Sequence, residues 1–508
     1  MLRDEPELDR SERPSKRQRV STCVELRASP EDMNLSHPTI QLTPIESTLR
    51  TLLLDVAHHI HDNKPAEEGT VSSNSPETVL RFTGGWVRDK LLGVDSHDID
   101  VGISSMTGYH FGMALKKYLD EPGVLEKYKQ SLPDGEKSDA VVSLHKIEAN
   151  PEKSKHLETV TTKIFGMDID LVNLRKETYS EESRNPQMEF GTAVEDALRR
   201  DATINALFYN LNQSKLEDLT ERGLEDMKKK IIRTPLEPYQ TFKDDPLRVL
   251  RLIRFASRLG YQIDPETEAA MQNEDISIAL KLKISKERVL TELDKMLHGP
   301  DPRGALHLID RLGLYPTIFA NHQDDVTADT STWPLAYNAL ARLLHPDADD
   351  DEDVLAILER IRRILLQDDL AAYYGWMIAA FAPWTSVPTR TSKGPKGKPA
   401  PTRPVEIGRD SLRADNKTLN ILRDTTLSFA DIIECLSQTF QGTAAEIRQQ
   451  IGLRIRAWGK DWRLCVLLAI LQEIMKGRNF VDGKTRISVS FMQDDHVMLM
   501  EAHSDPRV

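Results

Sequence analysis

The chain has 508 residues and a formal net charge of −13, from 67 lysines and arginines against 80 aspartates and glutamates. Its hydrophobic share of 39% and charged share of 29% are those of a folded globular protein, and they exclude a fibrous or wholly disordered chain. The length predicts roughly three or four domains, and the acidic balance argues against a protein that binds nucleic acid with its whole surface.

The sequence also limits the membrane and disulfide possibilities. Its longest uninterrupted apolar run, 464–471, is far shorter than the roughly 18 residues that span a bilayer, so we expect a soluble protein without a membrane partner. Cys23, Cys435 and Cys465 are widely separated. Their spacing is typical neither of a zinc site nor of a redox motif, and it predicts a reducing compartment and no disulfide partner.

Residues 1–43 mix both charges without apolar periodicity, which predicts a disordered N-terminal arm. Within it, 15–19 reads Ser-Lys-Arg-Gln-Arg, which is typical of a nuclear-import cluster as much as of a solvated charge run. The arm is too acidic for a mitochondrial transit peptide. We therefore expect an intracellular protein of cytoplasm and nucleus that is not secreted, with a mitochondrial form through an alternative start at Met33.

The next part of the chain alternates helices and strands. We expect, in order, a helix near 45–60, strands at 78–83 and 98–103 around a helix at 86–92, and a hairpin of strands 158–165 and 167–174 that turns at Gly166. Strands interleaved with helices predict an α+β fold for the segment 44–212.

After Ala193 the apolar spacing is helical almost without interruption. The predicted helices are 195–209, 244–259, 286–297, 303–312, 332–344, 354–366 and 370–380, with a further helical unit from about 409. A basic, proline-rich tract at 388–404 cannot pack a core, so it predicts a linker or a loop insertion.

Two acids on one predicted strand suggest a metal site. Asp98 and Asp100 are two residues apart, so both carboxylates project from one face while Ile99 and Val101 point into the core. Hard oxygen ligands at this spacing suit Mg²⁺. The pattern alone is weak, because the acidic run 347–353 contains it too and is best interpreted as a solvated loop.

The residues upstream strengthen the metal hypothesis. Gly84 and Gly85 lie between a predicted strand and a predicted helix, where backbone N–H groups can meet a phosphate and Arg88 can add charge. The alternative is a plain tight turn with Arg88 paired to Asp89. Phosphoryl transfer with two metal ions also needs a third acid. Asp168 and Asp170 share one face of a predicted strand, so alternation cannot choose between them.

These motifs together resemble the class II tRNA nucleotidyltransferases, the CCA-adding enzymes of the polymerase-beta-like nucleotidyltransferase superfamily. The resemblance is carried by 84–93, 98–101, 156–159, 170–175, 199–208 and 244–251, in the order of the family, and 150–156 looks like its fungal branch. It implies a nucleotidyltransferase head at 44–212, a helical neck at 213–282, a body at 283–385, the linker or insertion at 386–404, and a tRNA-binding tail at 405–508.

The resemblance also implies roles for single residues. The carboxylates that hold two Mg²⁺ ions in the family match Asp98, Asp100 and Asp170. By this match the third acid is Asp170 and not Asp168. Gly84, Gly85 and Arg88 match the phosphate-binding turn. Arg199, Asp201 and Asn205 match the motif that recognises the ribose, and the last two are one turn apart on the predicted helix, where they would otherwise be a solvated face.

Asp245 and Arg248 match the amino-acid template of the family. A carboxylate can accept a hydrogen bond from the exocyclic amine of cytosine or adenine while a guanidinium donates to the ring beside it, so G and U are rejected. By themselves the two residues, at i and i+3 of the predicted helix, would be an ordinary ion pair. Further arginines at 251, 254 and 258 extend a basic stripe, which could reach substrate phosphates or simply face solvent; Arg251 is our nucleotide-binding candidate.

The resemblance implies an enzyme that adds C, C and A to the 3′ end of tRNA from CTP and ATP, releasing pyrophosphate and using Mg²⁺. Its partner is tRNA, held at the acceptor end and elbow. Two alternatives stay open. A poly(A) polymerase of the same superfamily has similar head motifs, and a catalytically silent tRNA-binding factor would not need three convergent acids. The oligomeric state is not predicted.

Overall fold

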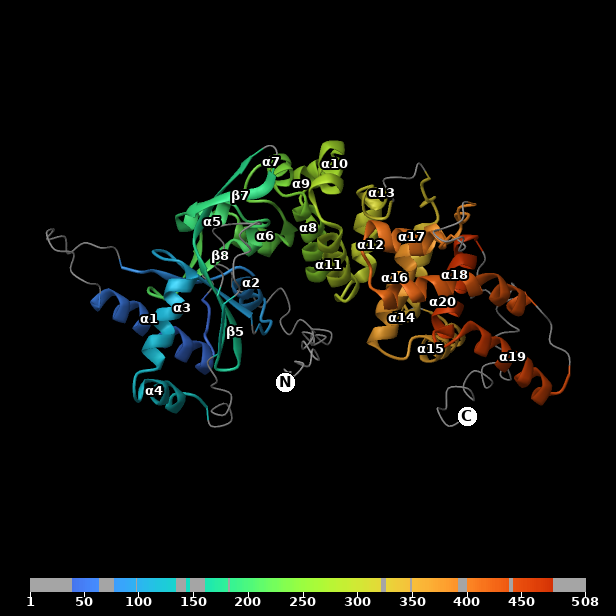
Figure 1. Cartoon of the computed structure of the whole chain (residues 1–508), viewed down its shortest axis with the longest axis horizontal. Coiled ribbons are helices and arrows are strands. Elements are labelled where there is room, and N and C mark those ends of the chain that lie inside the picture. Colours follow the sequence, from blue (N-terminus) through green and yellow to red (C-terminus); the bar gives the residue numbers. More distant parts are fainter. Residues whose placement is uncertain are drawn as a thin grey trace, which may run out of the picture.

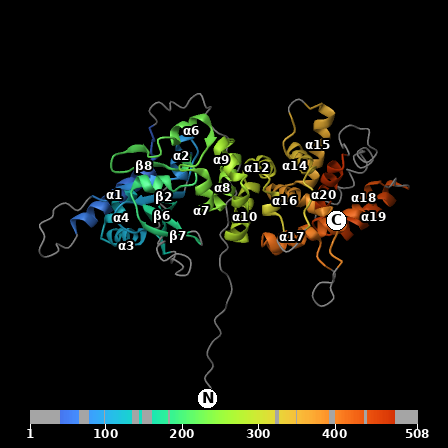
Figure 2. The same cartoon turned by 90° about the horizontal axis from the view of Figure 1, so that it is seen from above.

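The computed structural model describes residues 39–63, 77–96, 98–133, 143–146, 160–180, 183–320, 326–347, 350–391, 400–437 and 442–477. An α+β head forms one end of an elongated, arched molecule, helices of the middle of the chain form its crest, and a helical body forms the other end (Figures 1 and 2). The predicted α+β fold is therefore confirmed. None of the described helices is long and apolar enough to cross a membrane.

The head is organised around a seven-stranded sheet of order β3-β4-β5-β2-β1-β8-β9. Its strands are β1 (Leu80–Thr83), β2 (Asp98–Ile103), β3 (Ser143–Lys146), β4 (Val160–Ile164), β5 (Met167–Asn173), β8 (Leu207–Asn210) and β9 (Lys215–Asp218). Only the β2–β5 pair within this sheet is parallel, and β4–β5 is the predicted hairpin. Because β9 completes the sheet, the sheet extends beyond residue 212, where the sequence predicted the neck to begin.

One face of this sheet is packed against helices. Helix α1 (Pro44–Asp62) and helix α3 (Gly108–Leu119) contact each other, and α3 contacts β5; α4 (Val124–Gln130) follows. Leu49, Leu52 and Val56 of α1 are fully buried, as the spacing of three and four predicts. The opposite face is thereby left for the polar side chains of β2 and β5.

The helix predicted at 195–209 is wrong. The chain instead forms α5 (Ala193–Leu198), a short 3-10 helix at Thr203–Asn205 and strand β8. The apolar run Leu207–Tyr209 is fully buried between β1 and β9, and a short apolar run of this kind suits a buried strand as well as a helix. A second, two-stranded sheet, β6 (Arg175–Ser180) with β7 (Ser183–Phe190), was not predicted at all.

The neck and the body follow as a run of helices. These are α6 (Gly223–Lys229), α7 (Pro238–Asp244), α8 (Leu247–Leu259), α9 (Pro265–Met271), α10 (Glu274–Lys283), α11 (Lys286–Leu297), α12 (Pro302–Arg311), α13 (Tyr315–Ile318), α14 (Trp333–Leu344), α15 (Glu352–Leu365), α16 (Asp369–Thr385), α17 (Arg403–Ser411), α18 (Asn416–Ser437), α19 (Ala444–Trp458) and α20 (Trp462–Met475), with the short parallel strands β10 (Ile231–Ile232) and β11 (Gln262–Ile263) between them. The helix predicted at 286–297 is confirmed.

The helix predicted at 244–259 is two helices. Asp245 lies between α7 and α8 with φ −132° and ψ 94°, because the ring of Pro246 disfavours the helical region for the residue before it. Asp245 and Arg248 therefore do not share a helix. The chain therefore changes direction between α7 and α8, where the two predicted base-selecting residues lie.

Helix α16 forms the centre of the body and is buried from Tyr373 to Trp384. Pro383 has no N–H to donate to the carbonyl of Ala379, and the indole Nε1 of Trp333 on α14 donates to that oxygen instead, at 2.8 Å. The proline is thus tolerated inside a helix because a neighbouring helix replaces the missing donor.

The two ends of the basic, proline-rich tract lie together. Arg390 donates to Glu406 at 2.6 Å, and Arg403, the first residue of α17, donates to the carbonyl of Pro388 at 3.0 Å. Arg403 and Glu406 are buried. These contacts favour a loop inserted between α16 and α17 over a free linker, although 392–399 lie outside the described residues, as do the predicted arm up to 38 and the end of the chain from 478.

Candidate active site

The predicted carboxylates meet on neighbouring strands. In the parallel β2–β5 pair, Asp98 lies opposite Asp168 and Asp100 lies opposite Asp170. Ile99, between the two acids of β2, is fully buried on the other face. Adjacent strands are about 4.8 Å apart, so the pairing brings all four carboxylates to one patch of the sheet.

Asp100 lies where this negative charge is concentrated. Burial raises its pKa to about 6, with further upward contributions from Asp170 and Asp98, although the guanidinium of Arg200 acts in the opposite direction. A carboxylate that is hard to ionise beside two others is a place where a cation is favourable. Hard oxygen donors in this number fit Mg²⁺.

The two candidates for the third acid differ in their contacts. Asp168 is 59% exposed and lies 3.5 Å from Lys163, whereas Asp170 is opposite Asp100 and contributes to the shift of its pKa. Asp170 also accepts a hydrogen bond from Thr161 Oγ1 of β4 at 2.6 Å, which fixes its orientation. These contacts favour Asp170.

The acids lie on neighbouring strands but do not form a ready-made cluster of metal ligands. Among the residues that the structure describes, no group of three or more histidine, cysteine, aspartate or glutamate side chains is close enough to hold a metal ion. The register of β2 and β5 nevertheless places Asp98, Asp100 and Asp170 on neighbouring strands.

The glycine turn runs directly beside this patch. Gly84 links β1 to α2 (Gly85–Leu91) with φ 71° and ψ −133°, a conformation that favours glycine. A Cβ atom here would lie 3.0 Å from Arg200 Nη1 and 3.5 Å from Asp100 Oδ2. A larger residue would therefore strain the turn and enter the space next to the carboxylate.

Arg88 is buried below this turn. Its Nε and Nη2 atoms donate to Asp89 Oδ1 at 2.8 Å and 2.6 Å, and its Nη1 donates to Asn205 Oδ1 at 2.6 Å. Its Nη2 is also 3.6 Å from where a Cβ on Gly85 would lie. The Arg88–Asp89 pair of the simpler interpretation is therefore present, and it holds Arg88 under the predicted phosphate-binding turn.

Asp201 is paired with an arginine of α8. Its carboxylate accepts from Arg251 Nε at 2.6 Å. Burial by itself raises the pKa of Asp201, but the charge and hydrogen bond of Arg251, with help from Arg248 and Arg254, lower it to about 2. Asp201 is thus held as an acceptor. Although Asp201 and Asn205 do not share a helix, their partners Arg251 and Arg88 lie against the same ring, that of Phe255.

We expect Arg251→Gln to destabilise the protein by about 1–3 kcal/mol at pH 7, because it leaves the buried carboxylate of Asp201 without its charged partner. The pKa of Asp201 is lowered on folding, so this stabilisation is present above the unfolded value of about 3.9. It is lost as the pH falls toward about 2. Urea unfolding at pH 7, 4 and 3 should show the difference from wild type shrinking below pH 4. Arg423→Gln, at an exposed pair with Asp424, should change stability much less.

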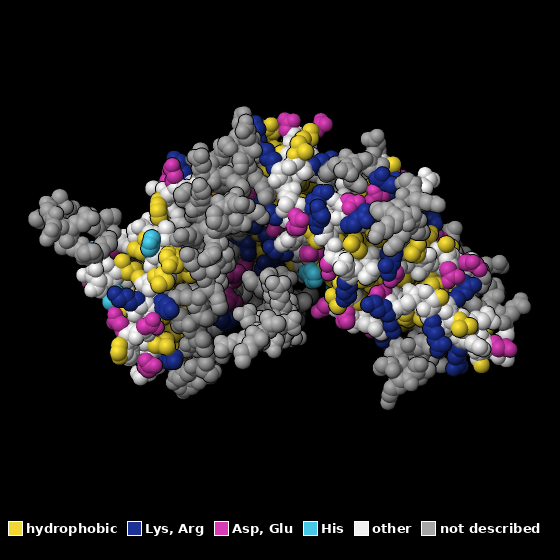
Figure 3. All heavy atoms as spheres, viewed as in Figure 1, with side chains coloured by type: hydrophobic (Ala, Val, Ile, Leu, Met, Phe, Trp, Pro, Cys, Tyr) yellow, Lys and Arg dark blue, Asp and Glu magenta, His cyan; other side chains and the backbone are white. Residues whose placement is uncertain are grey.

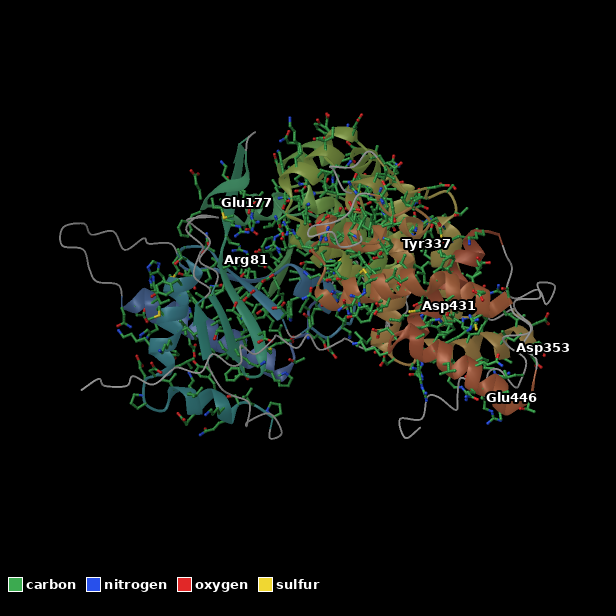
Figure 4. All side chains as sticks on the ribbon, turned by 45° about the vertical axis from the view of Figure 1, so that its right-hand side comes forward. Arg81, Glu177, Tyr337, Asp353, Asp431 and Glu446 are labelled. Carbon is green, nitrogen blue, oxygen red and sulfur yellow. The ribbon has the colours of Figure 1, made fainter. Side chains whose placement is uncertain are left out.

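Arg199 belongs to a network that the sequence did not reveal. It donates to Asp196 Oδ1 at 2.5 Å and to Glu177 Oε1 at 2.9 Å, while Arg200 donates to the other oxygen of Asp196 at 2.9 Å. The spacing Asp196, Arg199, Arg200 could have indicated this pairing. Glu177 gave no signal, because it comes from the unpredicted hairpin; it lies above the sheet residue Arg81 in Figure 4.

The base-selecting candidates are held by residues from other elements. Arg248 Nη2 lies 3.9 Å from Glu177 Oε2, and Asp245 Oδ2 lies 3.8 Å from Arg288 Nη2 of α11. Asp245 also accepts from the backbone N–H of Leu247 at 3.2 Å. Asp245 and Arg248 thus each have a neighbour of opposite charge from another element.

Each arginine of the basic stripe of α8 lies beside an acid, although Arg251 and Arg258 are also exposed to solvent. The four arginines and their partners are Arg248 with Glu177, Arg251 with Asp201, Arg254 with Glu292, and Arg258 with Asp89. Basic and acidic side chains accordingly lie together on the concave side of the molecule, where head and neck meet (Figure 3). The stripe joins the head and α11 to the neck.

Comparison with known proteins places the chain in a family. Residues 80–233 match the family model of the poly A polymerase head domain, and 260–325 match that of a probable RNA- and SrmB-binding site of polymerase A. A structure of a CCA-adding enzyme in an apo form superimposes with a TM-score of 0.56 at 19% identity, covering 86% of this chain and 83% of that one. The Thermotoga maritima CCA-adding enzyme complexed with tRNA gives 0.53 at 18%, covering 84% and 80%. These structures show the same fold.

Sequence relatives give the family. A nucleotidyltransferase of Purpureocillium lilacinum is 42% identical over 86% of this chain and 72% of its own length. A tRNA nucleotidyltransferase of Schizosaccharomyces pombe, cca2, is 33% identical over 86% and 82%. The mitochondrial CCA tRNA nucleotidyltransferase of Saccharomyces cerevisiae is 51% identical to this chain. The match covers 57% of this chain and 50% of the length of the yeast protein. The resemblance seen in the motifs is confirmed: the chain belongs to the class II tRNA nucleotidyltransferases, the CCA-adding enzymes, of the fungal type.

Proposed function

We propose that this protein adds C, C and A to the 3′ end of tRNA, using CTP and ATP and releasing pyrophosphate. The observation that carries the proposal is the pairing of β2 with β5, which brings Asp100 and Asp170 together beside the Gly84 turn. Relatives named CCA tRNA nucleotidyltransferases and neighbouring structures with tRNA, ATP and CTP support the same substrates.

Asp98, Asp100 and Asp170 would hold Mg²⁺. When bound, the metal supplies charge neutralisation at the phosphates and lowers the pKa of the attacking hydroxyl. The chain's own residues bind and orient the nucleotide. The Gly84–Gly85 turn offers its backbone to the phosphates, with the guanidinium of Arg88 directly below it.

The ribose is recognised by groups that Arg88 and Arg251 hold in place. Asp201 is kept ionised by Arg251 and can only accept a hydrogen bond, as from a ribose hydroxyl. The Oδ1 atom of Asn205 accepts from Arg88, so its amide NH₂ is the group that can donate. Arg199 supports this segment through Asp196.

Asp245 and Arg248 would select the base by the hydrogen-bonding pattern of cytosine and adenine. Both lie at the α7–α8 turn, where Glu177 is 3.9 Å from Arg248 and Arg288 is 3.8 Å from Asp245. The head, neck, body and tail boundaries that the resemblance implies are part of the proposal, with the body and tail holding tRNA by shape and phosphate contacts. We propose cytoplasm and nucleus as compartments, and a mitochondrial form because two yeast relatives are named mitochondrial.

A stepwise extension assay tests this function. Three tRNA transcripts, ending before CCA, after C and after CC, are each given CTP, ATP, GTP or UTP singly with Mg²⁺. We expect CTP to extend the first two and ATP only the third. ATP added repeatedly to all three would instead identify a poly(A) polymerase. Transcripts that bind without extension under every condition would identify a silent tRNA-binding factor.

A further inference from the structure

One buried aromatic ring on α8 contacts three guanidinium groups. Phe255 is 5% exposed, and the guanidinium carbons of Arg254, Arg251 and Arg88 lie 4.5 Å, 5.5 Å and 5.9 Å from its ring centre. The first two are its neighbours on α8, whereas Arg88 comes from the head. A guanidinium within about 6 Å of a ring centre is attracted by the ring quadrupole, and the attraction is stronger where water is excluded.

Each of these arginines is also bonded to its own carboxylate. The pairs are Arg88 with Asp89, Arg251 with Asp201 and Arg254 with Glu292, each at 2.6 Å. The acids come from α2, from the segment before the 3-10 helix and from α11, so each guanidinium is bonded to a different element. All three guanidiniums nevertheless lie against the ring of Phe255.

We propose that Phe255 is a positioning residue that presents Arg88 and Arg251 as a preformed cation pair for the triphosphate of the incoming nucleotide. Arg88 is 4% exposed and lies next to Gly85 of the phosphate-binding turn, so it acts through its charge from behind the turn. Arg251 is 37% exposed and can contact a phosphate directly. A polyanion binds more tightly to cations already held in place, because less side-chain entropy is lost. The inference rests on the proposed nucleotide function, since it assigns the triphosphate to this turn.

The test measures binding without catalysis. Inorganic tripolyphosphate and AMP are titrated separately into wild type, Phe255→Leu, Phe255→Tyr and Phe111→Leu, the last being the same change at a fully buried ring of α3. We expect Phe255→Leu to weaken tripolyphosphate binding about five- to tenfold, because leucine fills the space without a quadrupole. Phe255→Tyr, which keeps the ring, should restore most of the affinity. AMP binding should fall less than tripolyphosphate binding in Phe255→Leu, since AMP shares the ribose contacts that Arg88 and Arg251 support but lacks the β and γ phosphates.

Four results would overturn the inference. The first three are a folded Phe255→Leu that binds tripolyphosphate as wild type does, an equal loss of AMP binding, and an equal effect of Phe111→Leu. Wild type that fails to bind tripolyphosphate would overturn it as well. A wild type that adds no nucleotide to tRNA, yet binds tripolyphosphate in a ring-dependent way, would refute the proposed function and leave the role of Phe255 standing.

Discussion

Asp100→Asn is expected to lower the rate of nucleotide addition at least about a thousandfold, since a metal ion contributes several kcal/mol to charge stabilisation in phosphoryl transfer. The amide keeps the size of the side chain but removes the charge that faces Asp170 across the β2–β5 pair. The fold should not suffer. Asp100 is buried beside two other acids, so loss of its charge relieves repulsion in the metal-free protein.

The matched control is Asp168→Asn on the same face of β5. Asp168 is exposed and pairs with Lys163, so its loss should change the rate by no more than about threefold. Single-turnover extension of a tRNA ending in CC gives the rates, and thermal unfolding without metal gives the stabilities. Equal losses of activity in the two variants would contradict this prediction. They would show that the total negative charge of the patch matters, and that Asp100 has no special role as a metal ligand.

Asp245→Asn is expected to relax the choice of base. The carboxylate can only accept a hydrogen bond from an exocyclic amine, whereas an amide can turn its NH₂ toward the carbonyl that uracil presents there. One such pair contributes about 1–3 kcal/mol of discrimination, so the preference for CTP over UTP should fall about 10- to 100-fold. Competition between CTP and UTP on a tRNA lacking CCA, read by product sequencing, measures the ratio.

Asp244→Asn is the control for this substitution. Asp244 ends α7 and accepts from Gln240 Nε2 at 2.7 Å within the same helix, so its neutralisation should leave the ratio of CTP to UTP unchanged. If both variants lose discrimination equally, the α7–α8 turn as a whole, rather than the carboxylate of Asp245, selects the base.

The sequence was most informative where the spacing of apolar residues alone determines the secondary structure. Alternation in 98–101 predicted that Ile99 and Val101 point into the core, and the structure confirms that both are buried. Spacing also predicted helix 286–297. It could not choose between Asp168 and Asp170, because both lie on one face. The contacts of the two side chains distinguish them, because Asp168 is exposed beside Lys163 whereas Asp170 accepts from Thr161.

The sequence was misleading where tertiary contacts decide the structure. The apolar spacing of Leu207–Tyr209 continues that of a helix. The segment nevertheless forms strand β8, because it pairs with β1. The break before α8 could have been predicted from Pro246, which disfavours helix at Asp245. The role of Glu177 could not, because Arg199 and Arg248 lie far from it in sequence and only the hairpin brings the three together.

The most direct test of the account gives the wild-type enzyme a tRNA transcript that lacks CCA, with all four nucleotides and Mg²⁺ present together, and sequences the extended 3′ ends. The arrangement of Asp100, Asp245 and Arg248 predicts products that end in CCA and then stop, without G or U. A ladder of A residues, mixed additions, or no addition to a tRNA that is demonstrably bound would contradict it.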